Sequence, residues 1–305
     1  MKYQKYKNFP VIIIFSSFLI IGILIYGDYG ISWDEYYHRI NGFVSLNFLR
    51  KIFLLDIYPG LEHDSKFLAE SSKMYGVLFD LPMAFIEKKL QIDDPKNYFL
   101  IRHFFNFFIF FIASVFFFLL LKKRFSNKLS IIGLLFLILS PRIFAESFYN
   151  NKDIVFMSLF IITLYTGIKL LKKPNFINAI YFSFTSALAI DIRVSGLVLP
   201  TLILLFYIMN MLHDSDYKKK TLKPLLVFLL TAPIFITFFW PSLWQNPLTK
   251  FVEAFSSLSN FDVNIFNLYL GEYIAAKNLP WHYPIVWIFI STPFSRAASK
   301  ILCVP

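Results

Sequence analysis

The sequence predicts an all-α, polytopic membrane protein with about eight transmembrane spans. Three observations point to this class. Of the 305 residues, 57% are hydrophobic and 20% are aromatic. Only 16% are charged, whereas a soluble domain of this length carries about 25%. The apolar residues form solid runs that are too long for ordinary core helices, and they lack the alternation of apolar and polar residues that a β-barrel requires.

The net charge bears on the possible partners, and the cysteine content bears on disulfides. The net charge is +11, which in a soluble protein would point to nucleic acid. In a membrane protein, Lys and Arg act as cytoplasmic topology signals and bind anionic lipid. We therefore expect membrane lipids, and no nucleic acid, as partners. Cys303 is the single cysteine, so no disulfide forms within the chain and the redox compartment is left open.

The first span is expected over residues 11–27, an unbroken apolar run. Lys2, Lys5 and Lys7 precede this run and keep the N-terminus in the cytoplasm. A basic N-terminus before an apolar run also describes a secretory signal peptide. An uncleaved span is favoured, because the run is long, no small-residue cleavage site follows it, and further apolar runs come later.

The rest of the chain divides into apolar runs and polar connections. An external segment over residues 28–97 contains two short amphipathic stretches, near 40–58 and 74–90, that are expected to lie in the membrane interface. The later spans are separated by short loops. They are expected at about 98–121, 129–145, 154–171, 176–190, 194–212 and 224–240, with an eighth beginning at Pro284 after an external loop of about 241–283.

The basic loops fix the orientation of these spans. Loops 122–128, 172–175 and 213–223 are densely basic, which places them in the cytoplasm. Shifting the count by one span would move all three outside. Segment 28–97 also holds lysines, but loops of that length translocate largely regardless of their charge. We expect one transmembrane domain over residues 1–305, with its polar site on the outer side.

Polar residues gather at the outer ends of the expected spans. A charge at the membrane edge is costly unless it is paired or hydrated, so such residues are functional candidates. The set comprises Asp34, Glu35, Glu146, Asn150, Asn151, Lys152, Asp153, Asp191, Arg193, Glu272, Lys277, Trp281 and His282.

The acidic candidates also have ordinary structural interpretations. Asp34 and Glu35 suit a helix N-terminus, where Glu35 would face His38 and Arg39 one turn later. Asp153 suits the N-cap of the span that follows it. Neither interpretation requires a function.

The other candidates have similar alternatives. Arg193 and Lys152 would hold lipid head groups, and His282 is an ordinary interfacial aromatic without a second metal ligand at regular spacing. Glu146 and Asp153 are seven residues apart, so a continuous helix would place them on one face. Together, acids from two outer loops with nearby Arg and Lys predict an acid/base and phosphate site at the water–lipid boundary.

Several stretches resemble GT-C integral-membrane glycosyltransferases, above all the protein O-mannosyltransferase-like group that includes bacterial lipid A aminoarabinose transferases. WDE at 33–35 resembles the acidic signature of the first external loop of that superfamily. SPRIFAESFYNNKDIVF at 140–156 resembles the second external loop. FWPSLWQNPLTKFVEAF at 239–255 and YLGEYIAAKNLPWHYPIVWIFISTP at 269–293 resemble later segments of bacterial members. The likeness covers most of residues 11–294.

The resemblance implies a reaction and three catalytic residues. Such enzymes transfer a sugar from a polyprenyl-phosphate carrier to a protein, lipid or glycan hydroxyl on the outer face of the membrane, usually with inversion. Asp34 would accept the proton of the attacking hydroxyl. Glu35 would orient the acceptor or Asp34. Asp153, by its likeness to the acid of the second loop, would position the acceptor or support the base.

The resemblance also assigns binding residues and bears on metal use. Arg193 leads the candidates for the donor phosphate, with Arg102 and Lys152 behind it. The acceptor-binding candidates are Glu146, Glu272 and His282. No cofactor or metal is expected, although Asp34, Glu35 and Asp153 would offer carboxylates to Mg²⁺ or Mn²⁺.

The resemblance also predicts where the protein is located and how long it should be, and two other functions compete with the enzyme. The resemblance implies a multi-pass protein of the bacterial inner membrane with a cytoplasmic N-terminus and a periplasmic or extracellular active site. Members usually run well beyond 305 residues, and SRAASK from Ser295 breaks the last apolar run, so a truncated, frameshifted or split member is expected. The alternative functions are a flippase or transporter of lipid-linked sugars, which would show internal repeats, and a non-catalytic membrane subunit.

Overall fold

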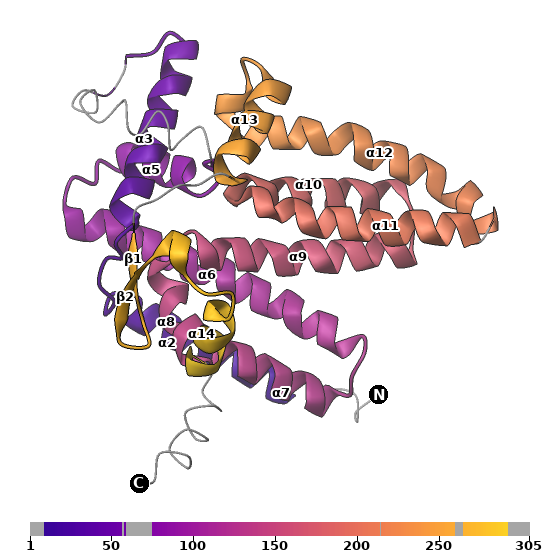
Figure 1. The fold of residues 1–305 in the computed structure, drawn as a ribbon, viewed down its shortest axis with the longest axis horizontal. Helices are drawn as coiled ribbons and strands as arrows, with labels where there is room; N and C mark the ends of the chain where they lie inside the picture. The colour runs from indigo at the N-terminus through magenta and orange to yellow at the C-terminus, as the bar shows by residue number, and fades with distance from the viewer. Residues whose placement is uncertain (1–8, 57, 59–74, 214, 260–264, 292–305) are drawn as a thin grey trace. The chain divides into compact units, whose positions relative to one another are not determined.

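The computed structural model describes residues 9–56, 58, 75–213, 215–259 and 265–291. Contacts divide the chain into two compact units, Met1–Phe255 and Ser256–Pro305. The described residues are mostly helical (Figure 1), and several helices are long and apolar enough to cross a membrane. The expected all-α membrane class is thereby confirmed. The basic residues before the first span lie outside the described residues.

The first unit begins with an apolar helix that packs against a much longer one. Helix α2 (Phe9–Ile25) and helix α6 (Pro95–Lys122) meet through aromatic rings. The Phe18 ring centroid lies 5.3 Å from that of Phe107 in an edge-to-face arrangement. A Cβ atom on Gly22 would lie 1.9 Å from Cζ of Phe107, so glycine is what allows the two helices to approach here.

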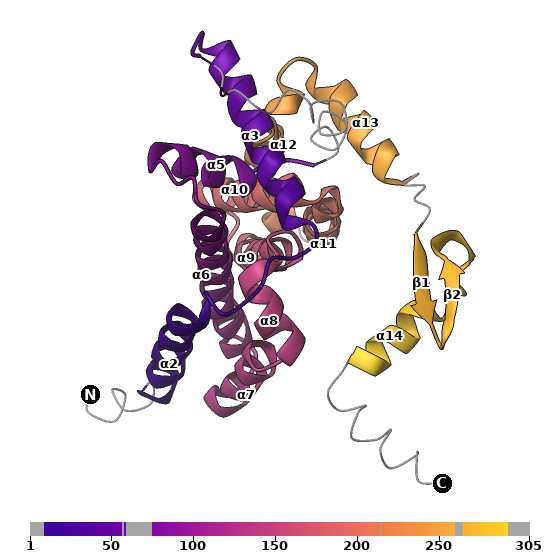
Figure 2. The same cartoon turned by 90° about the vertical axis from the view of Figure 1, so that its left-hand side faces the viewer.

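The external segment contributes two helices that pack on each other. Helix α3 (Glu35–Ile52) and helix α5 (Asp80–Lys89) stand beside the start of α6 in Figure 2. Their shared core consists of Phe43, Leu46 and Ala84, all buried. These helices correspond to the two amphipathic stretches predicted near 40–58 and 74–90. The residues between them, 59–74, lie outside the described part of the chain.

The third expected span is broken into two helices. Helix α7 (Asn127–Ile138) and helix α8 (Pro141–Tyr149) are bent by 59° relative to each other. Pro141 occupies the first turn of α8, where its fixed φ and missing N–H suit a helix start rather than a helix interior. The continuous helix predicted over 129–145 is therefore wrong in this respect. The break brings the polar end of α8 next to the start of the following helix.

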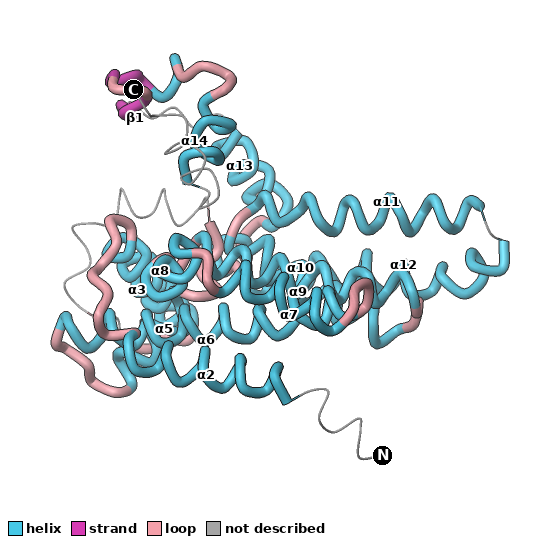
Figure 3. Tube along the Cα trace, turned by 90° about the horizontal axis from the view of Figure 1, so that it is seen from below, coloured by secondary structure: helices cyan, strands magenta, loops and turns pink. Residues whose placement is uncertain are grey.

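The helices from α9 to α12 run alongside one another (Figure 3). They are α9 (Asp153–Lys172), α10 (Phe176–Ile192), η1 (Val194–Leu197) continuing into α11 (Val198–His213), and α12 (Ser215–Phe239), followed by η2 (Pro241–Leu243) and α13 (Pro247–Ser259). Polar groups between them are satisfied across helices: the Thr163 hydroxyl donates to the Thr185 carbonyl at 2.9 Å. Such bonds join apolar helices that have no hydrophobic drive to associate in lipid.

Within the described residues, length and hydropathy single out four candidate spans, in α6, α9, η1–α11 and α12, or five if the bent pair α7–α8 counts as one. Helices α2 and α10, at 17 residues each, are apolar but shorter. Each span predicted from the sequence coincides with an apolar helix, except the third, which is the bent pair α7–α8. The eighth coincides with α14 (Tyr283–Ser291), of which nine residues are described.

The second unit contains a hairpin where the sequence predicts an external loop. Strands β1 (Phe266–Tyr269) and β2 (Glu272–Ala275) pair antiparallel, with Tyr269 opposite Glu272. Leu270 (φ 51°) and Gly271 (φ 94°) form the two-residue turn, whose positive φ values match the twist of such hairpins. The predicted break from Ser295 and Cys303 lie outside the described residues. The single transmembrane domain over 1–305 stays a prediction.

Candidate active site

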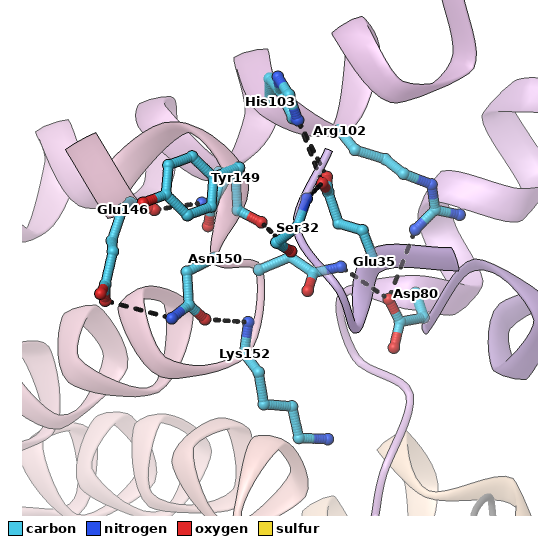
Figure 4. Close-up of polar contacts among 11 residues, drawn as sticks. Ser32, Glu35, Asp80, Arg102, His103, Glu146, Tyr149, Asn150 and Lys152 are labelled. Atoms are coloured by element: carbon cyan, nitrogen blue, oxygen red, sulfur yellow. Dashed lines mark hydrogen bonds and ion pairs between the residues drawn. The ribbon is translucent and has the colours of Figure 1, made fainter. Parts of the chain in front are cut away.

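Polar side chains converge in the first unit where the ends of several helices meet. Figure 4 shows the start of α3, the start of α5, the first turns of α6 and the α8–α9 junction contributing to one cluster. These segments are far apart in the sequence: Glu35 and His103 interact across 68 positions. The Ser32 hydroxyl also donates to the Tyr149 carbonyl at 3.3 Å, so the first external loop lies beside the second.

The adjacent acids at the start of α3 point into different surroundings. Asp34 is exposed at the N-cap position and makes no capping hydrogen bond with its side chain. Glu35 is fully buried. Its Oε2 atom accepts the backbone N–H of Ser32 at 2.9 Å, and its Oε1 atom lies 3.1 Å from Nε2 of His103. Glu35 thus anchors this turn to α6, while the carboxylate of Asp34 is open to a substrate.

The pairing of Glu35 with His38 and Arg39 along α3 is not found. Nδ1 of His38 lies 3.8 Å from Oδ2 of Asp80, and Arg39 forms a two-point ion pair with Glu87. Both partners belong to α5. Because α3 packs against α5, the face that carries His38 and Arg39 is turned towards α5 rather than along its own helix.

A buried ion pair lies beneath the start of α3. Nη1 of Arg102 lies 3.4 Å from Oδ1 of Asp80, which also accepts the Asn151 amide at 3.4 Å. Arg102 is 1% exposed and Asp80 6%. Burial raises the pKa of Asp80 to about 6, and the nearby charges of Arg102 and Lys152 act in the opposite direction.

Asp80 and His38 belong to this cluster although the sequence does not predict them as site residues. Burial lowers the pKa of His38 to about 3, and the positive charges of Lys152 and Arg102 add to this effect. His38 is therefore neutral at physiological pH. The local signal for Asp80 is its place inside the apolar stretch VLFDLPM at 77–83, where an unpaired carboxylate would be costly.

Asn150 organises the α8–α9 junction. Its Oδ1 atom accepts the backbone N–H groups of Lys152 at 3.3 Å and Asp153 at 2.8 Å, so Asn150 rather than Asp153 supplies the acceptor at the start of α9. Its Nδ2 group donates to Glu146 and to Asp153, at 3.2 Å each. The two acids are joined by this amide across a helix break, not by sharing one face of a continuous helix.

Two cations face the outer acids. Arg193, at the C-cap of α10, forms an ion pair with Asp153. The ammonium of Lys152 lies 3.9 Å from the ring centroid of Tyr75. Burial lowers the pKa of Lys152 to about 8, while Asp80 opposes this shift. Burial raises the pKa of Tyr75, the charge of Arg193 lowers it and that of Asp34 raises it, so both charges lie within electrostatic range of Tyr75.

The other predicted site residues have different positions. Arg102 lies in the cluster, but its guanidinium is buried against Asp80. Glu146 binds Nε of Arg142 at 2.8 Å. Glu272 is exposed on β2, and His282 lies against Tyr269 with ring centroids 5.9 Å apart, both in the second unit. The roles of Glu272 and His282 stay predictions.

The described part of the chain contains no assembled set of metal ligands. Within those residues, no group of three or more His, Cys, Asp or Glu side chains is arranged to hold an ion. Glu35 turns to His103 while Asp34 faces outward, so these two carboxylates do not converge. The expectation of no metal stays a prediction.

Comparison with known proteins adds one finding. Residues 97–244 match the family model of the dolichyl-phosphate-mannose-protein mannosyltransferases. This mannosyltransferase match runs from the first turn of α6 past η2, and so includes Lys152, Asp153 and Arg193. It indicates a membrane glycosyltransferase of the mannosyltransferase type. It gives no assignment to the bacterial aminoarabinose branch. No curated protein and no solved structure matches the chain.

Proposed function

We propose that the chain transfers a sugar from a polyprenyl-phosphate donor to a hydroxyl of a protein, lipid or glycan at the outer face of the membrane, with inversion. The observation that carries this proposal is the open carboxylate of Asp34 in the same region as the cations Arg193 and Lys152. The mannosyltransferase match over residues 97–244 supports the reaction type.

Asp34 is the proposed general base. The acceptor oxygen attacks the anomeric carbon of the sugar, its proton passes to the Asp34 carboxylate, and the bond between that carbon and the phosphate oxygen breaks. Attack opposite the leaving group inverts the configuration. Asp34 suits this role because its carboxylate is exposed and makes no capping bond. Glu35 is buried, so we assign it the task of positioning Asp34.

Arg193 and Lys152 are the proposed phosphate-binding residues. As the glycosidic bond breaks, negative charge grows on the phosphate, and fixed cations stabilise that charge. Arg193 forms an ion pair with Asp153, so the donor phosphate would bind a guanidinium group that Asp153 already positions. The side chain of Arg102 is committed to Asp80. We therefore place Arg102 behind the other two and assign it mainly to the support of the cluster.

The membrane setting fits such a donor. The cluster lies at the ends of apolar helices, including α6 and α9, which are long enough to span the hydrocarbon. The phosphate would remain in water while the isoprenoid tail enters the lipid. By the distribution of Lys and Arg, we propose a cytoplasmic N-terminus and an outward-facing site in a bacterial plasma membrane. Glu146, Glu272 and His282 remain acceptor candidates.

Lys152 gives the reaction an expected alkaline limit. The donor phosphodiester does not titrate near neutrality, whereas Lys152 loses its charge as the pH rises through about 8. We expect kcat/KM for the donor to fall above that pH. Lys152→Arg keeps the positive charge, because arginine stays protonated, and should remove the fall. A pH–rate profile of both proteins from pH 6 to 9.5 tests this, and an alkaline limb unchanged in the Arg variant would contradict the assignment.

The proposed function itself is tested by reconstitution. Purified protein in liposomes is supplied with the total polyprenyl-phosphate sugar lipids of the host and, separately, with nucleotide sugars. Mass spectrometry of envelope proteins, lipids and glycans, with and without the gene, identifies the acceptor. We expect sugar transfer from the lipid-linked pool only. Transfer from a nucleotide sugar, or an envelope unchanged by loss of the gene, would contradict the proposal.

A further inference from the structure

A short segment, residues 75–79, is held at the end of α10 by one buried residue, Asp191. The backbone N–H of Gly76 donates to the Asp191 carbonyl at 2.9 Å, and that of Leu78 donates to Oδ2 of Asp191 at 2.7 Å. Asp191 is 0% exposed, and its Oδ1 atom has no hydrogen-bond partner among the described residues. Because the Asp191 side chain is fully buried and binds a backbone N–H group, its role is to position this segment.

Gly76 is required for this close approach. A Cβ atom at position 76 would lie 1.9 Å from Oδ1 of Asp191 and 2.6 Å from its carbonyl oxygen. Real Cβ atoms do not come this near, so any side chain here would push the segment away from α10. The segment is therefore held in one register, and the side chain of Tyr75 is held with it.

Tyr75 contacts Lys152, one of the proposed phosphate-binding residues. The Lys152 ammonium lies 3.9 Å from the centre of its ring, a cation–π contact that fixes the ring. Besides burial, which is the largest influence, the charges of Arg193, Asp34 and Asp153 act on the pKa of its hydroxyl. Among the described residues, the structure gives this hydroxyl no hydrogen bond. Burial raises the pKa of Tyr75, so the hydroxyl keeps its proton and is a donor.

We propose that Tyr75 is a substrate-positioning residue whose hydroxyl donates a hydrogen bond to the phosphate of the polyprenyl-linked donor, and that Asp191 sets its position through Gly76 and Leu78. The inference rests on the proposed function, because the ligand is the donor of that reaction. A phosphate oxygen is the acceptor that the surrounding Arg193 and Lys152 attract. No bond is made or broken by Tyr75; it orients the leaving group relative to Asp34.

Tyr75→Phe is the direct test, because it removes the hydroxyl and keeps the ring beneath Lys152. We expect KM for the donor to rise roughly 10- to 100-fold, the range for loss of a hydrogen bond to a charged group, with kcat little changed. Tyr181→Phe is the matched control. Tyr181 also carries a lysine over its ring, Lys169 at 5.8 Å, but lies on the earlier part of α10. Its KM should equal that of the wild type.

Equilibrium binding separates this inference from the proposed chemistry. Affinity for polyprenyl monophosphate in detergent micelles is measured for the wild type, Tyr75→Phe and Asp34→Asn. We expect weaker binding only for Tyr75→Phe. Equal KM and equal affinity in wild type and Tyr75→Phe would overturn the inference while leaving the reaction intact. Transfer that survives Asp34→Asn, with binding still weakened by Tyr75→Phe, would overturn the proposed base and leave the role of Tyr75 standing.

The role of Asp191 is tested by rescue and by non-additivity. Asp191→Ala removes the acceptor for the Leu78 N–H and should raise KM as Tyr75→Phe does. Asp191→Asn retains a side-chain oxygen and should restore much of the loss. If both residues act through one hydroxyl, the double variant Asp191→Ala/Tyr75→Phe is no weaker than either single variant. Additive effects, or an Asp191→Ala protein with wild-type KM, would overturn the positioning role.

Discussion

Asp34→Asn is expected to reduce sugar transfer by a factor of roughly 10² to 10⁴, the usual contribution of a positioned general base. Asparagine has nearly the same size but cannot accept the proton of the attacking hydroxyl. Asp34 makes no capping hydrogen bond and is exposed, so the substitution costs little stability. The measurement is initial transfer rate at saturating lipid-linked donor, with the amount of protein in the membrane determined in parallel.

Asp28→Asn is the matched control for that experiment. Asp28 is also an exposed acid on the segment that leaves α2, six residues before Asp34. Its substitution changes the net charge by the same amount and should leave the transfer rate at the wild-type value. A rate for Asp34→Asn that equals the rate for Asp28→Asn would remove Asp34 from the chemistry.

Asp80→Asn is expected to have the largest effect on stability. Arg102 is 1% exposed and would keep its charge without a carboxylate beside it. Removing one partner of a buried ion pair costs about 3–5 kcal/mol. The substitution also removes the unfavourable burial of the charged Asp80 carboxylate, which offsets part of this cost. Thermal unfolding of the purified protein in detergent measures the change in Tm.

An exposed ion pair provides the control for Asp80→Asn. Lys250 and Glu253 lie 2.7 Å apart, and the Glu253 side chain is 52% exposed. Glu253→Gln should therefore change the free energy of unfolding by less than about 1 kcal/mol. If Asp80→Asn and Glu253→Gln shift Tm equally little, the Asp80–Arg102 pair does not hold the cluster together.

The pH dependence of stability provides a second readout of the same substitution. The pKa of Asp80 is raised to about 6, so its contribution to stability is present below pH 4 and is lost as the pH rises to 6. The pKa of His38 is lowered to about 3, so its contribution is lost as the pH falls from 6.5. These two trends oppose each other between pH 4 and 6. In Asp80→Asn only the His38 trend remains, and stability should rise more steeply with pH.

The membrane class and the outer acids could be predicted from local patterns. Long apolar runs predict helices, because a helix makes all the backbone hydrogen bonds of a segment internally when lipid surrounds it. Asp34, Lys152, Asp153 and Arg193 stand at the ends of such runs, where a charge is conspicuous. The sequence also carries a signal for the break in the third span, because Pro141 lies inside the apolar run 129–145.

The inner part of the site could not be predicted in the same way. Asp80, His38 and Tyr75 belong to the external segment, whose polar residues look ordinary in sequence. Their significance comes from contacts across long separations, such as the 113 positions between Leu78 and Asp191. Local periodicity does not encode which loop crosses which helix end. The same limit explains why Glu35 was expected to pair along α3 rather than with α6.

The sidedness of Asp34 is the claim on which the proposed reaction depends, and cysteine labelling measures it. In a Cys303→Ser background, Trp33→Cys places a thiol beside Asp34 at a position whose native side chain is 87% exposed. Arg124→Cys places one in the basic loop 122–128. An impermeant maleimide added to intact cells should label position 33 at once and position 124 only after permeabilisation. Labelling of position 124 in intact cells, with position 33 protected until the membrane is opened, would place the carboxylate on the cytoplasmic side and contradict the proposed enzyme.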